Sequence, residues 1–202
     1  MWALLQRKTQ ILVLVAMTVV TLLGVQGVSE LWMGELPPLG RLISMIAFVI
    51  GTGALAFANW GWRWLWRKFP ILNKVFFPDL NGTWEGTLKS TWIDPKTEKG
   101  IAPIPSRLVI RQGILHFSIK QQTGESKSWS THVIPEADPD ADRYRIWYGY
   151  TNKPKMEFSH RSNDHDGIAW FEIEIDEDPD HLVGQYFTSR RTSGDMDFRR
   201  VG

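Results

Sequence analysis

The sequence contains no cysteine. Disulfide bonds and thiolate metal sites are therefore excluded, and the redox compartment is left open. The chain also lacks a sizeable net charge: the formal value at pH 7 is +1. That balance conceals an uneven distribution: residues 1–75 hold seven basic and two acidic side chains, and residues 76–202 hold sixteen basic and twenty acidic ones. An acidic C-terminal part argues against a surface for a nucleic-acid polymer, which requires a basic face.

Motifs for catalysis and metal binding are also lacking. The sequence has no Gly-x-Ser-x-Gly elbow, no Walker loop and no His-Glu-x-x-His pair. The stretch Asp138–Arg143 begins like a calcium loop, but Arg143 occupies the position that needs glycine. The loop with His160 and His165 matches no spacing of zinc ligands. We therefore predict no catalytic residue, no metal and no cofactor, and we expect a protein that is not an enzyme.

Two long uncharged runs are present instead. Ile11–Val25 with its flanking polar residues reaches about the 18–20 residues that cross a bilayer, and Leu42–Ala58 is similar. The segment Glu35–Gly40 separates the runs, because its two prolines break a helix. Neither run has the polar face of a soluble core helix, and no cleavage site of small residues follows the first run. We predict a transmembrane hairpin of two helices in residues 1–75.

The charges around this hairpin predict its orientation. Basic residues precede the first run and follow the second, whereas the connection is acidic. The positive-inside rule then makes the protein two-pass, with both termini in the cytoplasm. Four tryptophans just after the second run form an Arg-containing juxtamembrane segment, where indole rings favour the headgroup region. These membrane-interface candidates are Trp60, Trp62, Trp64 and Trp66.

From residue 76 onward the sequence alternates apolar and polar residues in short segments, separated by turns rich in Pro, Asp and Gly. The expected strands cover 82–92, 104–112, 114–123, 126–134, 143–152, 167–176, 181–191 and 194–201. Eight sequential strands without an intervening helix indicate an up-and-down antiparallel β-barrel. The predicted fold is thus a membrane-anchored all-β protein with a lipocalin-like, cytoplasmic, ligand-binding barrel in residues 76–202.

Alternation within the strands indicates which side chains face inward, although a slip of one residue would exchange the two faces. Trp84 is expected to plug one end of the barrel, and Gly86 allows the first strand to bend. Other inward positions mix apolar residues with hydroxyl, amide and guanidinium groups, as Tyr150 and Arg190 illustrate. A polar lining favours a cavity for a polar ligand. The alternative is that such residues are solvated at the barrel mouth.

Several segments, in this order behind two apolar helices, resemble a known bacterial family. They are Leu80–Gly86 (LNGTWEG), Ser126–Ser130 (SKSWS), Tyr148–Pro154 (YGYTNKP), Asp164–Gly167 (DHDG) and Leu182–Arg200 (LVGQYFTSRRTSGDMDFRR). The family comprises the two-transmembrane, β-strand-rich effectors of cyclic-oligonucleotide-based anti-phage (CBASS) systems. The resemblance covers almost the whole chain.

This resemblance implies an anti-phage defence effector of the bacterial inner membrane. Its barrel would sense a cyclic dinucleotide made by a partner synthase, ligand binding would promote homo-oligomerisation, and the spans would disrupt the membrane lipids and cause abortive infection. Aromatic faces would serve the bases, and cations and neutral donors would serve the phosphates. The candidate ligand-binding residues are Ser128, Ser130, Tyr148, Tyr150, Asn152, His165, Tyr186, Thr188, Arg190, Thr192 and Arg200.

Two other interpretations stay open. A membrane-tethered lipocalin-like barrel would bind a small apolar ligand, and the Gly82-Thr83-Trp84 start is compatible with it because lipocalins open with a similar motif. A membrane scaffold would bind protein partners and would have a fully packed interior. The polar lining and the cytoplasmic placement favour the nucleotide sensor over the lipocalin.

Overall fold

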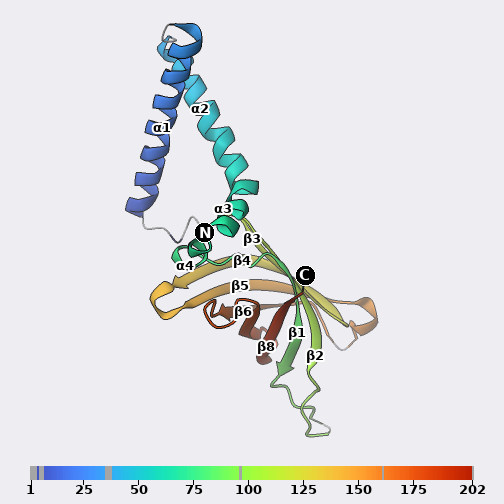
Figure 1. Cartoon of the computed structure of the whole chain (residues 1–202). Helices are drawn as coiled ribbons and strands as arrows, with labels where there is room; N and C mark the ends of the chain where they lie inside the picture. Colours follow the sequence, from blue (N-terminus) through green and yellow to red (C-terminus); the bar gives the residue numbers. More distant parts are fainter. Residues whose placement is uncertain (1–3, 5–6, 35–37, 96, 161, 202) are drawn as a thin grey trace. The chain divides into compact units, whose positions relative to one another are not determined.

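The computed structural model describes residues 4, 7–34, 38–95, 97–160 and 162–201, without the side chains of residues 32 and 33. By its contacts the chain forms two compact units, Met1–Lys68 and Phe69–Gly202, each of which is described by itself. The elements, shown in Figure 1, are α1 (Arg7–Met33), α2 (Leu39–Ala56), η2 (Phe57–Gly61), α3 (Trp62–Lys68), α4 (Ile71–Val75), β1 (Gly82–Ser90), β2 (Ile104–Gln112), β3 (Phe117–Thr123), β4 (Ser126–Asp138), η3 (Pro139–Ala141), β5 (Arg143–Pro154), η4 (Met156–Phe158), β6 (His165–Ile173), β7 (His181–Thr188) and β8 (Ser193–Val201).

The first unit is helical and apolar. Helices α1 and α2 run in opposite directions (Figure 1), and most of their side chains are exposed. Pro38 stands at the N-terminal cap of α2, whereas residues 35–37 of the predicted helix break lie outside the described residues. By length and composition, two segments are sufficient to cross a membrane, Arg7–Leu31 and Leu39–Lys68.

The four juxtamembrane tryptophans lie on the continuous helical path through η2 and α3. Trp60 and Trp64 are exposed, whereas the rings of Trp62 and Trp66 contact each other edge to face with centres 5.6 Å apart. The turn η2 is a π-helical widening. The expected location of these tryptophans at a membrane interface stays a prediction.

In the second unit, β1–β8 close into a barrel in chain order, and β1 pairs with β8. The predicted fold, two long apolar helices followed by an eight-stranded up-and-down barrel, is confirmed. The observed bounds differ most from the predicted ones at β4, which was expected to end at residue 134 and runs past Pro135 to Asp138. The ladder from β3 covers only residues 127–129 of β4, so Pro135 lies beyond it, where a missing N–H donor is tolerated.

One end of the barrel is filled by apolar side chains and covered by the segment that precedes β1. Phe77 and Leu80 of this segment are fully buried, and Phe77 packs edge to face on Tyr144 of β5. The Gln112 side chain, at the end of β2, accepts from Leu80 N at 2.8 Å and donates to Pro78 O at 3.0 Å. We call this the closed end.

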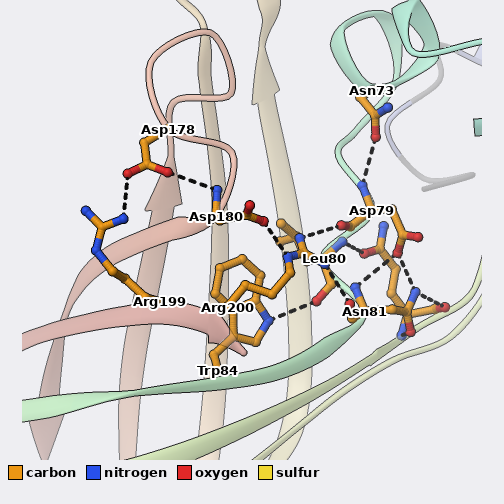
Figure 2. Close-up of polar contacts among 10 residues, drawn as sticks. Asn73, Asp79, Leu80, Asn81, Trp84, Asp178, Asp180, Arg199 and Arg200 are labelled. Atoms are coloured by element: carbon orange, nitrogen blue, oxygen red, sulfur yellow. Dashed lines mark hydrogen bonds and ion pairs between the residues drawn. The ribbon is translucent and has the colours of Figure 1, made fainter. Parts of the chain in front are cut away.

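Trp84 and Arg200 form the plug of the closed end (Figure 2). Trp84 is fully buried, and the Arg200 guanidinium lies 4.3 Å from the centre of its ring. The guanidinium donates to the carbonyl oxygens of Asn81 and Asp79 at 2.8 and 2.9 Å, and its Nε lies 2.9 Å from a carboxylate oxygen of Asp180. The plug therefore connects β8 to the segment before β1 and to the loop before β7.

The closure between β1 and β8 gives a test of the fold. Gly86 pairs with Phe198, and a Cβ at Gly86 would collide with the carbonyl oxygen of Asp197. We expect Gly86→Ala to lower the free energy of unfolding by about 1–3 kcal/mol, because the added Cβ would push β1 and β8 apart. Urea denaturation followed by circular dichroism measures this change.

The matched control is Gly124→Ala in the β3–β4 turn, where a Cβ would meet nothing within 4 Å. This variant should unfold like the wild type. Wild-type stability of Gly86→Ala would contradict the closure of the barrel at this pair.

Candidate functional site

The end of the barrel opposite the closed end is polar on its inner surface. A row of inward-facing side chains runs in register across β3, β4, β5 and β6: Gln121, Ser128, Asn152 and His165. Ser128 and Asn152 are each only 8% exposed, so protein encloses both. Hydroxyl, amide and imidazole groups thus stand where the closed end has aliphatic and aromatic side chains. We call this region the polar end.

Three tyrosines face inward near the polar end. On β5, Tyr148 and Tyr150 have ring centres 6.0 Å apart. The Tyr150 ring lies against Gly167 of β6, where a Cβ would collide with its phenol group. The Tyr186 ring lies against Gly194 of β8 in the same way. Both glycines therefore provide the space that the two rings occupy, because a side chain at either position would collide with the ring.

Arg190 supplies a positive charge at the polar end. It lies in the turn between β7 and β8, and its Nη1 donates to Ser162 Oγ at 2.8 Å in the loop before β6. Burial lowers the pKa of His165, and the charge of Arg190 lowers this pKa further. The same charge opposes the rise in the pKa of Tyr150 that burial and Tyr186 cause. Arg190 therefore acts electrostatically on both His165 and Tyr150.

The hydroxyl groups of the polar end are neutral donors. Burial is the main cause that raises the pKa of Tyr148 and of Tyr150, so both phenols stay protonated at neutral pH. Thr188 and Thr192 face each other across the β7–β8 turn, with their hydroxyl oxygens 2.7 Å apart. Aromatic rings, neutral donors and one cation are the groups that bind an anionic heterocycle.

The structure brings together most of the candidate ligand-binding residues. Those at the polar end or directly beneath it are Ser128, Tyr148, Tyr150, Asn152, His165, Tyr186, Thr188, Arg190 and Thr192. Two candidates are placed differently. Ser130 Oγ accepts a hydrogen bond from Ile119 N at 2.9 Å, next to an irregularity in the β4–β5 register. Arg200 belongs to the plug at the closed end, so we leave it out of the candidate site.

Sequence reasoning missed three polar residues at this end. Gln121 Nε2 donates to Ser106 Oγ at 3.1 Å, and Ser106 is 7% exposed. Ser106 lies on the same face of β2 as the buried Leu108 and Ile110, so alternation continued by two residues toward the start of β2 could have found it. Ser162, the partner of Arg190, lies in a loop where no periodic pattern exists.

The outer wall of the barrel offers two shallow hollows of about 220 and 280 Å³. The smaller one is lined mainly by Glu172, Glu174, Glu177 and Asp178. Its negative charge is concentrated enough for Glu177 to raise the pKa of Glu174. An anionic ligand would be repelled there by the like charges.

The mouth of a β-barrel with convergent polar groups is a common place for a small-molecule site, and this barrel gathers tyrosines, hydroxyls and an arginine at the end opposite its sealed one. Residues 75–200 match the family model described as Cap15, cyclic dinucleotide receptor domain. The chain belongs to this family, because the match covers more than half of it, and the expected membership of the CBASS effectors is confirmed. No curated protein matches the chain significantly.

The electrostatic effect of Arg190 on His165 gives a test that needs no ligand. We expect His165 to titrate below its ordinary pKa of 6.5, and Arg190→Gln to raise its midpoint, because one cause of the depression is removed. NMR detection of the imidazole protons measures both midpoints. Arg191→Gln, which changes the adjacent exposed arginine, should leave the midpoint unchanged. Identical midpoints in Arg190→Gln and the wild type would contradict the geometry of the polar end.

Proposed function

We propose that the polar end of the barrel binds a cyclic dinucleotide and that the chain is a membrane-disrupting effector of anti-phage defence. The observation that carries the proposal is the convergence of Tyr150, Tyr186 and Arg190 at one end of a barrel whose other end is sealed. A cyclic dinucleotide presents two bases and two phosphates. Aromatic rings bind base faces, and a guanidinium forms charge-assisted hydrogen bonds with phosphate.

Neutral groups at the polar end would complete this recognition. The Asn152 amide both donates and accepts hydrogen bonds, and the Ser128 hydroxyl does the same. Their cross-strand pairing holds the two groups side by side on the inner surface. Such groups suit the edges of nucleobases and the ribose hydroxyls, which are themselves neutral donors and acceptors.

The membrane part of the proposal is supported by α1 and by the segment Leu39–Lys68. Leu12 is 68% and Phe48 is 72% exposed, which suits contact with lipid tails. Basic residues lie at the start of α1 and at the end of α3. On our proposal the chain crosses the bacterial inner membrane twice, with both termini and the barrel in the cytoplasm.

The proposal includes oligomerisation on ligand binding, and the outer wall of the barrel supports it. Ile134, Trp147 and Trp170 lie in register on the outer face of β4, β5 and β6, and Ile168 pairs with Phe187 beside them. Ile134 is 61% and Ile168 is 57% exposed. The Arg145 guanidinium stacks on the rings of Trp147 and Trp170. Exposed apolar side chains gathered in this way are typical of protein interaction sites, and we assign this surface to a second copy of the chain.

The alternative functions are less consistent with the polar end. A carrier of an apolar ligand would not line the inner surface of its barrel with Ser128 and Asn152, because an apolar ligand offers no hydrogen bond to these buried polar groups. A scaffold for protein partners would not need tyrosines packed on inward glycines. The role that we propose for the barrel is ligand binding and not catalysis. We propose that a partner synthase makes the cyclic dinucleotide.

Ligand binding is the first test. The full-length chain in detergent should bind at least one of cyclic di-AMP, cyclic di-GMP and cyclic GMP–AMP in isothermal titration calorimetry. Arg190→Ala should weaken this binding about tenfold or more, which corresponds to the roughly 1.5–3 kcal/mol of a charged hydrogen bond. The control Arg111→Ala removes an exposed cation from β2 and should bind like the wild type. Absence of binding to every cyclic dinucleotide would reject the sensor.

Membrane disruption is the second test. In vesicles of phosphatidylethanolamine and phosphatidylglycerol, the full chain should release an entrapped dye only when the bound cyclic dinucleotide is added. Ile134→Glu should reduce release and oligomer formation without changing ligand affinity, because it charges the outer apolar surface. The control Gln122→Glu adds the same charge at an exposed residue of β3. Release without ligand would indicate a constitutive pore, and intact vesicles with ligand would contradict an effector.

A further inference from the structure

The hydroxyl of Tyr148 is enclosed in the barrel without a hydrogen-bond partner. Among the side chains that the structure describes, the two enclosed polar atoms without a hydrogen bond are Tyr148 Oη and Arg200 Nε. Arg200 Nε has the carboxylate of Asp180 at 2.9 Å, so its charge is compensated. Tyr148 is 3% exposed, and its hydroxyl has no such compensation.

An enclosed hydroxyl without a partner is unfavourable, because it has lost its hydrogen bonds to water. Phenylalanine would fill the same space without this cost. Buried polar groups are almost always paired in native structures, so an unpaired one calls for an explanation such as a partner in another state of the protein. The ligand-bound state is the state in which Tyr148 would find an acceptor.

The surroundings of Tyr148 indicate the chemistry of that acceptor. Its ring stacks on Phe171 with centres 5.7 Å apart, and Tyr150 is the next inward residue toward the polar end. Tyr150 pairs through Gly167 with Thr188 at the end of β7, next to the turn that holds Arg190, whereas Tyr148 lies one inward position deeper. A phosphate at this depth would be desolvated far from its cation, which is costly. A neutral acceptor between aromatic rings suits the position.

We infer that the cyclic dinucleotide enters the barrel base first, with an acceptor atom of one nucleobase reaching Tyr148 Oη and the phosphates remaining at the level of Arg190. The inference rests on the proposed function of the polar end. Because Tyr150 stands one inward position nearer that end, its ring turns aside when the base enters. Tyr148 then determines specificity, since a base without an acceptor at that edge leaves the hydroxyl unpaired.

The test is Tyr148→Phe in the full-length chain. Calorimetry with cyclic di-AMP, cyclic di-GMP and cyclic GMP–AMP should show about a tenfold loss of affinity for the dinucleotide that the wild type binds best, which corresponds to about 1.4 kcal/mol. The melting temperature of the ligand-free variant should equal or exceed that of the wild type, because the lost hydroxyl had no partner.

The matched control is Tyr144→Phe on the same strand. Its hydroxyl donates to Lys74 O at 2.7 Å near the closed end. This variant should melt at a lower temperature and keep the wild-type affinity. The two variants together separate a ligand contact from a structural hydrogen bond.

The outcomes distinguish the inference from the function on which it rests. If the wild type binds a cyclic dinucleotide and Tyr148→Phe binds it equally well, the base-first orientation is overturned and the sensor stands. A lower melting temperature of the ligand-free Tyr148→Phe also overturns the inference, because the hydroxyl would then have a partner without ligand. If the wild type binds none of the three, the proposed function itself fails.

Discussion

The stacking of the Arg200 guanidinium on the Trp84 ring is the contact on which the barrel depends. The two residues are direct cross-strand partners on β8 and β1, the pair of strands that closes the sheet. A cation over an indole ring contributes about 0.5–2 kcal/mol, and more where water is excluded. Arg200 also donates to Asn81 and Asp79, so the last strand holds the segment that leads into the first. The contacts of Arg200 therefore both close the sheet and seal one end of the barrel.

A sealed end divides the interior of the barrel along its axis. Strand β5 illustrates the division: Tyr144 and Ile146 are buried near the closed end, Tyr148 follows, and Tyr150 and Asn152 reach the polar end. Within the second unit, the segment before β1 lies at the closed end, where Lys74 O accepts from the Tyr144 hydroxyl and Phe77 packs on the Tyr144 ring. The proposed ligand binds at the other end of the same strands.

Much of this fold could be predicted from the sequence, because alternation and turn residues are local signals. Eight strands and two apolar helices were predictable, and the extension of β4 through Pro135 was not, since it depends on where β3 stops pairing. Arg190 and Arg200 were both candidates for the ligand site, but β7 and β8 run in opposite directions, so the turn after β7 and the end of β8 lie at opposite ends of the barrel. Strand direction could have separated them. The role of Ser130 and the unpaired Tyr148 hydroxyl depend on tertiary packing, which no local pattern encodes.

The central claim is that the polar end is the cyclic dinucleotide site. A structure of the full chain with its bound cyclic dinucleotide tests it most directly. The account predicts the ligand inside the barrel, with a phosphate at Arg190 and a base between the tyrosines. A ligand seated on the outer wall, for example in the hollow lined by Thr87, Trp170 and Asp197, would contradict the account.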